Sequence, residues 1–338
     1  VRPSSKTLMT RTLTHTRPLD RLCRTAPRPR VRSVASGHVD LGDAFVSAEV
    51  EDASTVITNA RVRMPRMIYG TAWKKERTKE LVVLAVRQGF RGIDTACQPK
   101  HYREDLVGDA LALLYAEGTV RREDLFLQTK FTLPGGHDER APYDLDASRS
   151  QQVQQSFALS LKNLQTEYVD SLVLHSPAES HDATMEVWRA LEKIADAGEA
   201  KQLGISNCDL GALQLLHKEA RVKPSIVQNR FYKDTDYDDE LRHWCASVGI
   251  RYQSFWTLTA NPDLLQSPEV VQLASARGRT TEQILFRFAL DEGICPLTGT
   301  SCKEHMSMDL QVLGDAPLTQ GEGSVVVAKM APPRCSIL

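Results

Sequence analysis

Long apolar runs and an excess of charge of one sign are both missing from the sequence. No stretch approaches the roughly 18 consecutive apolar residues that a membrane-spanning helix requires, which excludes an ordinary transmembrane helix. The 42 Lys and Arg residues nearly balance the 43 Asp and Glu residues, leaving a formal net charge of -1. This balance does not favour nucleic acid or an anionic membrane as a partner. We therefore expect a soluble protein that acts on a small molecule, with a monomer as the default because no interface pattern is apparent.

Cysteines with metal-ligand spacing and the GxGxxG motif are missing as well. The seven cysteines are scattered and odd in number, which favours packed thiols in a reducing compartment over a disulfide framework or a metal site. No GxGxxG follows the first predicted strand, which argues against a doubly wound dinucleotide-binding sheet. The sequence therefore predicts no metal site and an architecture other than the doubly wound sheet.

The first 36 residues are rich in Arg, Ser and Thr and contain one acidic residue, Asp20. This composition resembles an organellar transit peptide. The alternative is a disordered basic tail or a non-native upstream sequence. We predict that residues 1–54 form an extension outside the fold. The protein is expected in a plastid or mitochondrion if this extension is a transit peptide, and in the cytoplasm otherwise.

From about residue 60 onward, short apolar runs alternate with helical patterns, as expected for βαβ units. Helical spacing is clear at Val153, Phe157, Leu161 and Leu164. Eight such units in a chain of this length favour a single (β/α)8 barrel over residues 55–320. The predicted strands are Met67–Ala72, Gly92–Thr95, Leu125–Thr129, Ser171–His175, Gln202–Ser206, Ile226–Asn229, Ile250–Ser254 and Cys295–Thr298.

Two segments flank the predicted barrel. Thr55–Arg66 is expected to form a small hairpin or strand that caps the bottom of the barrel. The tail Gly321–Leu338, rich in Val, Ala and Pro, is too short for a complete substrate-specificity loop, and we interpret it as a disordered tail. Between the third strand and its helix, the loop Leu133–Asp146 is either a substrate lid or a passive connection.

Polar residues terminate several of the apolar runs. Asp94, Lys130 and His175 each end a predicted strand, and Tyr102 follows the first of these strands. The catalytic groups of such barrels lie at the carboxyl ends of the strands. Each residue alone would more often be a solvated or structural residue, but together they form a set suited to carbonyl reduction.

Hydride reduction of a carbonyl creates an alkoxide, which needs a proton donor. Tyr102 can supply the proton, and an adjacent Lys130 ammonium would lower the tyrosine pKa from its ordinary value near 10. Asp94 would balance and position that lysine. A neutral His175 would donate to the carbonyl oxygen, while a nicotinamide carries the hydride.

These residues and their surroundings resemble the aldo-keto reductase family from Val62 to Leu313. The motifs that carry the resemblance are Met64-Pro65 with Gly70-Thr71-Ala72-Trp73, Gly92-Ile93-Asp94-Thr95-Ala96, Tyr102 to Gly108, Tyr168-Val169-Asp170 leading to Leu172-Val173-Leu174-His175-Ser176-Pro177, Leu203-Gly204-Ile205-Ser206-Asn207 and Pro224 to Gln228. Any one of them alone would be weak, but their number and order make the match specific.

The resemblance implies a catalytic tetrad of Asp94, Tyr102, Lys130 and His175. It implies NADPH as the cofactor, with NADH as the alternative. The implied cofactor-binding residues are Gly70, Thr71, Ser206, Asn207, Gln228, Ser254, Gly299, Thr300, Ser301, Lys303, His305 and Asp309, the phosphates lying at the amino end of a helix that begins near Lys303. The implied substrate-binding residues are Trp73, His175, Thr132 and Ser176.

The sequence departs from the family pattern in the interval before the tyrosine. Tyr102 lies eight positions after Asp94, about three more than in relatives, and Gln98-Pro99-Lys100-His101 occupies the interval. The loop must bulge, and His101 is an alternative proton donor. Thr132 and Ser176 replace pocket aromatics, which predicts a wider and more polar pocket.

Two further departures concern the cofactor. Gly299 and His305 stand where relatives that prefer NADPH carry a lysine and an arginine, and Lys303 is the candidate to compensate. Gln253 stands where an aromatic usually stacks on the nicotinamide, so that Tyr252, Phe255 or Trp256 would take that part.

Several alternatives stay open at this point. Ser206 and Asn207 could also cap the helix predicted over Asp209–His217, and this interpretation and cofactor binding could both hold. Phe231-Tyr232 could be packing or pocket. The rival function is a non-catalytic regulatory subunit that binds a nicotinamide cofactor on the same barrel, and the complete tetrad argues against it.

Overall fold

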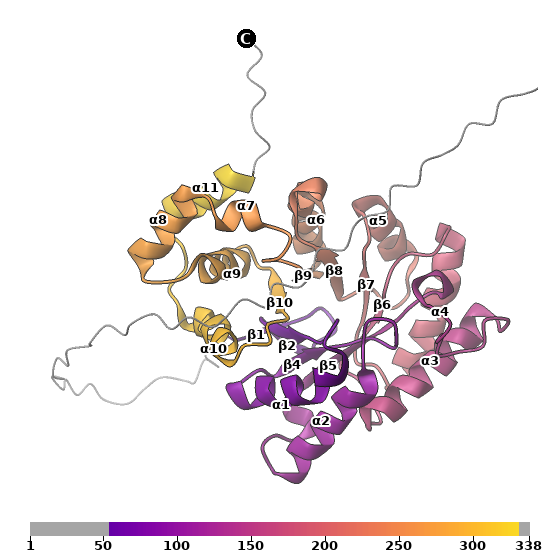
Figure 1. Ribbon diagram of the computed structural model, residues 1–338. Coiled ribbons are helices and arrows are strands. Elements are labelled where there is room, and N and C mark those ends of the chain that lie inside the picture. The colour runs from indigo at the N-terminus through magenta and orange to yellow at the C-terminus, as the bar shows by residue number, and fades with distance from the viewer. Residues whose placement is uncertain (1–53, 331–338) are drawn as a thin grey trace, which may run out of the picture. The chain divides into compact units, whose positions relative to one another are not determined.

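The computed structural model of the chain describes residues 54–330. Eight parallel strands close into a barrel in the order β10-β3-β4-β5-β6-β7-β8-β9, with helices around it (Figure 1). The predicted (β/α)8 barrel is therefore confirmed, and all eight predicted strands are present with small shifts at their ends. They are β3 (Ile68–Gly70), β4 (Gly92–Asp94), β5 (Phe126–Phe131), β6 (Ser171–Leu174), β7 (Leu203–Ser206), β8 (Ile226–Arg230), β9 (Arg251–Phe255) and β10 (Cys295–Thr298).

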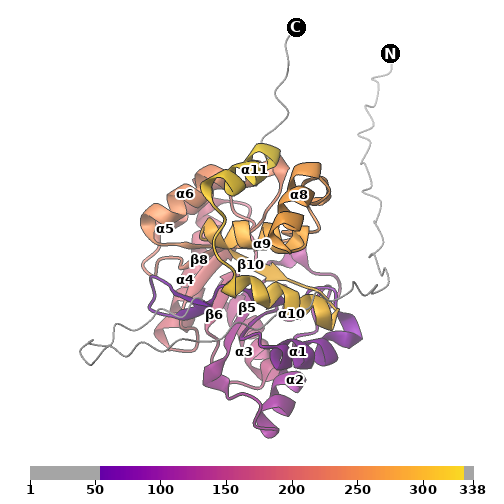
Figure 2. The same cartoon turned by 90° about the vertical axis from the view of Figure 1, so that its left-hand side faces the viewer.

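A helix follows each strand on the outside of the barrel. After β9, two shorter helices precede the one that returns the chain to β10, and α10 then lies beside α1 (Figure 2). These helices are α1 (Thr78–Gln88), α2 (Glu104–Ala116), α3 (Arg149–Leu164), α4 (His181–Asp196), α5 (Leu210–Glu219), α6 (Asp239–Val248), α7 (Pro262–Leu265), α8 (Pro268–Arg277), α9 (Thr281–Asp291) and α10 (Lys303–Gln311).

The helix ends follow local sequence signals. At the start of α3, the Ser148 hydroxyl accepts a hydrogen bond from the Gln151 amide. The Ser148 amide donates to the Gln151 side-chain oxygen. Helix α1 ends at Gly89, whose φ of 117° favours a residue without a Cβ. Val153 and Phe157 are buried on α3, as their spacing predicted.

A small antiparallel hairpin lies at the amino-terminal end of the barrel. It consists of β1 (Thr55–Ile57) and β2 (Arg63–Pro65), which confirms the hairpin expected over Thr55–Arg66. Val62 and Met64 from this hairpin pack against apolar side chains of the barrel interior. The hairpin therefore closes the bottom of the barrel.

The C-terminal tail corrects the sequence prediction. We expected disorder from Gly321 onward, but Gln320–Met330 forms helix α11, which lies against α7, α8 and α9 (Figures 1 and 2). Val326 is buried, and the Arg277 guanidinium of α8 makes two bonds of 2.8 Å to the Glu322 carboxylate. Tertiary contacts, which local composition does not report, order this segment.

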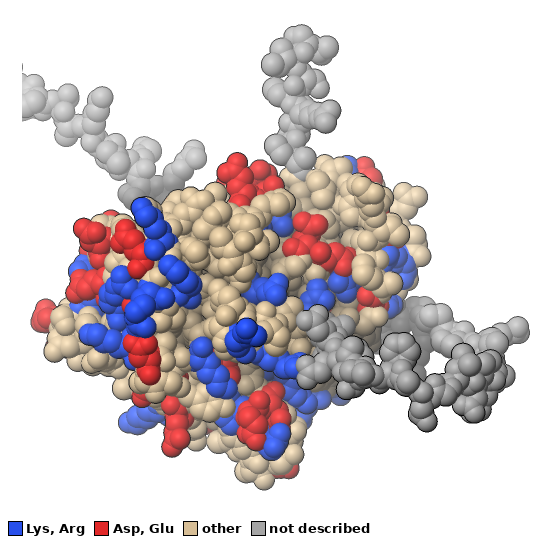
Figure 3. All heavy atoms as spheres, turned by 180° about the vertical axis from the view of Figure 1, so that it is seen from behind, with Lys and Arg blue, Asp and Glu red and all other residues tan. Residues whose placement is uncertain are grey.

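The remaining expectations concern the surface and the chain ends. Residues 1–53 of the predicted extension and residues 331–338 of the tail lie outside the described residues. Within residues 54–330, no helix has the length and apolar character needed to cross a bilayer. Basic and acidic side chains are interspersed on the face shown in Figure 3. The thiols of Cys97, Cys208, Cys245 and Cys295 are free and buried.

Candidate active site

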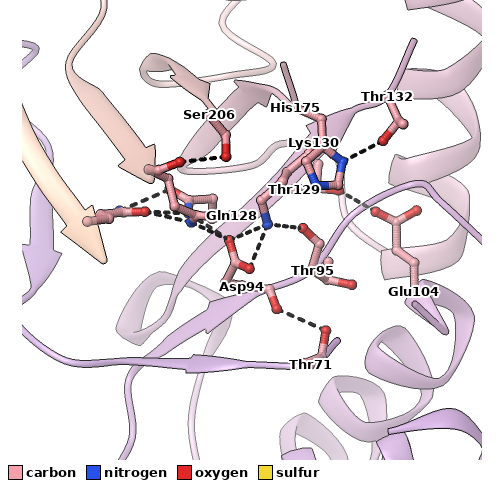
Figure 4. Close-up of polar contacts among 12 residues, drawn as sticks. Thr71, Asp94, Thr95, Glu104, Gln128, Thr129, Lys130, Thr132, His175 and Ser206 are labelled. Carbon is pink, nitrogen blue, oxygen red and sulfur yellow. Dashed lines mark hydrogen bonds and ion pairs between the residues drawn. The ribbon is translucent and has the colours of Figure 1, made fainter. Parts of the chain in front are cut away.

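A buried ion pair occupies the centre of the barrel near the carboxyl ends of the strands. Lys130 of β5 and Asp94 of β4 are 1% and 2% exposed. The Lys130 ammonium donates to both Asp94 carboxylate oxygens, at 2.6 Å each, and to the Thr95 carbonyl at 2.9 Å (Figure 4). Burial lowers the pKa of Lys130, while Asp94 acts in the opposite direction. The two charges can stay buried because each satisfies the other.

Three glutamine amides support this ion pair from within the barrel. Gln128 and Gln228 each donate to Asp94 Oδ1, at 2.7 and 3.1 Å, and to Gln253 Oε1, at 2.8 and 2.9 Å. The carboxylate therefore has hydrogen bonds beyond those from Lys130, which fix its position. Lys130 lies inside β5 rather than at its end, because this strand continues to Phe131.

Tyr102 returns to the site despite the insertion before it. Its ring centroid lies 5.3 Å from Lys130 Nζ and 6.1 Å from the centroid of the His175 ring, which it meets edge-on. A bond of 3.0 Å from the Tyr102 amide to the Gln98 carbonyl closes the preceding loop. The structure thus brings the four predicted catalytic side chains together.

The expected effect of Lys130 on Tyr102 is not found in this structure. Burial raises the pKa of Tyr102 well above its ordinary value, and the Asp94 carboxylate acts in the same direction. The prediction of a lowered pKa was wrong because the Lys130 charge is paired with Asp94 and the phenol is shielded from water. Tyr102 is therefore a protonated phenol, the form that a proton donor requires.

His175 lies directly after β6 and is electrically neutral. Burial first and the Lys130 charge second lower its pKa to about 3. Its Nδ1 atom lies 2.6 Å from the Thr132 hydroxyl (Figure 4). When that hydroxyl donates to Nδ1, the ring carries its proton on Nε2 and can donate it to a substrate oxygen. The Tyr143 hydroxyl donates to the Thr132 carbonyl at 2.7 Å and so fixes Thr132 in place.

Ser206 and Asn207 lie at the carboxyl end of β7, next to His175. The Ser206 hydroxyl donates to the Gln228 carbonyl at 2.6 Å, and the Asn207 amide donates to the His175 carbonyl at 2.9 Å. Their alternative interpretation as helix caps was wrong, because Asp209 caps α5 by accepting from the Ala212 amide at 2.8 Å. Both side chains are therefore placed at the mouth of the barrel.

The end of β9 differs from the expectation. Gln253 is fully buried and bonded to the amides beneath Asp94, so it does not lie where an aromatic would stack on a nicotinamide. Ser254 is also fully buried, and its hydroxyl lies 2.8 Å from that of Thr257. Side chains alternate along a strand, so Phe255 points to the same side as Gln253 but one layer higher. Phe255 is thus the aromatic best placed for stacking, while Tyr252 is buried and bonded to Asp238.

The turn after β10 and the start of α10 can hold an anionic group. Gly299 and Ser301 are exposed, and the Cys302 thiol at the start of α10 donates to the Glu304 carboxylate and does not cap a backbone amide of the first turn. Free amides at a helix start bind phosphate, and the exposed Lys303 and His305 add basic side chains. This donor set fits the phosphates of a nicotinamide dinucleotide.

Other predicted cofactor residues have contacts within the protein. The Asp309 carboxylate, whose pKa burial raises to about 6, accepts the Thr298 hydroxyl at 2.7 Å and joins α10 to β10. The Thr71 hydroxyl donates to the Asp94 carbonyl at 2.9 Å, and the Thr300 carbonyl accepts the Tyr69 hydroxyl at 3.0 Å. A Cβ on Gly70 would lie 3.6 Å from the Thr298 carbonyl, so ordinary contact distances apply there.

Two basic residues at the barrel mouth were missed from the sequence. The Lys74 ammonium donates to the Gly299 carbonyl, next to the phosphate-binding turn. The position of Lys74 directly after Trp73 is the sequence feature that could have identified it. Arg230 ends β8, and its guanidinium carbon lies 4.3 Å from the centroid of Trp256. The polar residue at the end of an apolar strand could have identified it.

The predicted substrate-binding residues differ in how exposed their side chains are. Trp73 is 56% exposed and has a φ of 64°, Ser176 is half-buried, and Thr132 is buried. Thr132 therefore acts on the site through its bond to His175, whereas Trp73 is available for contact. His137 also binds the Thr132 carbonyl, at 3.0 Å, from the loop Leu133–Asp146.

Comparisons with known proteins agree on one family. Residues 66–327 match the sequence model of the Aldo/keto reductase family. The glyoxal reductase of Bacillus subtilis is 30% identical over 241 residues, which cover 71% of this chain and 79% of that protein. The structure of an aldo-keto reductase of Brucella melitensis is similar, with a TM-score of 0.70, 26% identity and coverage of 82% and 98% of the two chains. A Bombyx mori aldo-keto reductase solved with NADP has a TM-score of 0.70 at 24% identity, covering 81% and 92%.

Proposed function

Because the chain belongs to the aldo-keto reductase family of oxidoreductases, which use NAD(P)H, we propose that it reduces aldehydes and ketones to alcohols with Tyr102 as the proton donor. One observation carries the proposal. Side chains from β4, β5, the end of β6 and the loop before α2 converge at the carboxyl ends of the strands. Catalytic groups of such barrels are placed there.

The roles follow from the protonation states. The nicotinamide, when bound, supplies the hydride to the carbonyl carbon. A neutral His175 with its proton on Nε2 orients the carbonyl oxygen, and Tyr102 gives its phenolic proton to the oxygen as negative charge develops there. The phenolate left behind lies beside the Lys130 ammonium, which Asp94 and its glutamine partners hold in position.

We favour NADPH over NADH as the cofactor. Lys303, His305 and Lys74 provide basic side chains around the turn after β10, where an extra phosphate dianion would be accommodated. The similar Bombyx mori enzyme was solved with NADP, which supports the same choice. Fluorescence titration with each cofactor tests it, and tighter binding of NADH would contradict it.

The central experiment removes the phenolic hydroxyl. Tyr102→Phe should lower kcat for aldehyde reduction by about 10²- to 10⁴-fold, because the alkoxide loses its proton donor, while NADPH binding is retained. The loss of NADPH absorbance with a panel of aldehydes measures turnover.

The matched control is Tyr168→Phe, a tyrosine whose ring lies against Lys201 and Arg122 away from the site. It should leave turnover unchanged. Undiminished turnover in Tyr102→Phe would refute the assignment of the acid. NADPH binding without reduction of any carbonyl by the unmodified protein would support the regulatory-subunit alternative instead.

A further inference from the structure

The insertion before Tyr102 places a histidine against the exposed tryptophan of the pocket. The ring centroids of His101 and Trp73 are 3.9 Å apart with an angle of 36° between the rings. The Trp73 amide also donates to the His101 carbonyl at 2.8 Å. Trp73 has a φ of 64°, a left-handed conformation that bulky residues rarely adopt and that is found mainly at functional sites. The two residues therefore form a single defined wall.

The insertion is also fixed to the loop that follows β5. Gln98, which is buried, donates from Nε2 to the Gly136 carbonyl at 2.7 Å. Gly136 also packs closely on Thr132, because a Cβ on Gly136 would lie 2.5 Å from the Thr132 Cγ2 atom. Thr132 in turn binds His175. The insertion is thus held in a fixed position relative to the catalytic histidine.

His101 has a ring nitrogen without a partner. Its Nδ1 atom is shielded from solvent and has no hydrogen bond within residues 54–330, and the same holds for Gln98 Oε1. An unpaired buried polar atom is unfavourable unless a ligand or water satisfies it. Burial first and the Lys100 charge second lower the pKa of His101, so the ring is neutral. A neutral imidazole suits an uncharged hydroxyl or carbonyl oxygen better than a carboxylate.

The position of His101 defines which part of a substrate it can reach. The reacting carbonyl oxygen must contact Tyr102 and His175, and His101 directly precedes Tyr102 in the chain. The same insertion is joined through Gln98 to Gly136, which packs on Thr132, the residue that binds His175. A substituent on the carbon next to the carbonyl therefore lies within its range.

We propose that His101 and Trp73 bind a second oxygen atom, a hydroxyl or carbonyl on the carbon next to the reacting carbonyl, and so select short oxygen-rich substrates. The inference rests on the proposed reductase function. It assigns His101 to substrate selection, whereas proton donation stays with Tyr102.

The test compares two aldehydes that differ in one group. 2-Hydroxypropanal and 2-methylpropanal have nearly the same shape, and the ratio of their kcat/KM values is measured with NADPH. His101→Phe keeps an aromatic ring against Trp73 but removes the nitrogens. It should reduce the ratio about tenfold relative to the unmodified protein, mainly by raising KM for the hydroxyaldehyde. Comparing the ratio between two proteins cancels the intrinsic reactivity of the substrates.

Two further variants make the result specific. His101→Asn, whose amide nitrogen approximates the position of Nδ1, should restore part of the ratio. His217→Phe is the matched control, because His217 also meets a tryptophan, Trp244, at 5.4 Å, but does so between α5 and α6. It should leave the ratio unchanged.

The outcomes separate the inference from the function. An equal effect of His101→Phe on both aldehydes would show a structural role only and overturn the inference, as would no effect on either. Both results leave the reductase function standing. If the unmodified protein reduces neither these aldehydes nor any other carbonyl, the proposed function fails and the inference fails with it.

Discussion

Inward-pointing strand positions form an apolar layer at one end of the barrel interior and a hydrogen-bonded polar network at the other. At the bottom, a layer of apolar side chains fills the interior, whereas β5 presents Gln128 and then Lys130 after Phe126 toward its carboxyl end. All three are buried, so burial alone does not separate the ends. The difference is that Gln128 and Lys130 both have a hydrogen-bond partner within the barrel, the Asp94 carboxylate. A polar barrel interior is therefore stable only as a connected network.

At the bottom, the interior is filled by closely packed apolar side chains. A Cβ on Gly204 would lie 2.3 Å from Ile226 Cγ1, so only glycine fits at this interior position of β7. Val62 and Met64 of the hairpin complete the apolar layer, which consists of Val62, Met64, Ile68, Phe126, Val173, Ile226 and Cys295. Bonds at the mouth, such as those of Ser206 and Asn207, can be exchanged for bonds to a ligand.

The largest effect is expected from breaking the polar network. Lys130→Met should lower kcat by about 10²- to 10⁴-fold and the free energy of unfolding by about 3–5 kcal/mol, because Asp94 keeps a buried charge without its cation. Urea unfolding and NADPH oxidation measure the two effects. The double variant with Asp94→Asn should recover much of the stability and none of the activity. Recovery of activity would show that the pair has only a structural role.

At the bottom, the expected effect is on stability alone. Phe126→Ala should lower the free energy of unfolding by about 3–5 kcal/mol, because it leaves a cavity in the apolar layer. Well below the unfolding temperature, kcat should be retained, since the tetrad does not contact this side chain. A fall in kcat comparable with that of Lys130→Met would contradict the division between the two ends.

The third effect concerns pH and His175, and per pH unit it is the smallest of the three. Its pKa of about 3 in the folded protein lies below the ordinary 6.5, so the unfolded chain takes up a proton between these values and the folded chain does not. This residue therefore makes the protein less stable as the pH falls from about 6.5 toward 3, by no more than about 1.4 kcal/mol per pH unit. His175→Gln should show a correspondingly flatter dependence in urea unfolding across that range. Parallel curves for the two proteins would mean that His175 is not held neutral.

The strands and the convergence of the candidate catalytic residues could be predicted because their signals are local. Each strand is a short apolar run, and Asp94, Lys130 and His175 stand out as polar residues at or near the ends of such runs. The expected position of Gln253 beside the nicotinamide was wrong. The alternation of side chains along β9, and not the residue type, decides that Gln253 points into the barrel. The helix α11 was missed since its order comes from Arg277 and the apolar surface of neighbouring helices.

By itself, the sequence determined the eight-fold alternation of strands and helices and the chemical types available at the barrel mouth. Periodicity and strand ends are properties of neighbouring residues, so they can be read without a fold. Only the tertiary structure decided that Tyr102 returns to Lys130 after its insertion, that its pKa is raised, and that His101 stacks on Trp73. Those outcomes depend on burial and on contacts between segments far apart in the chain, which no local pattern encodes.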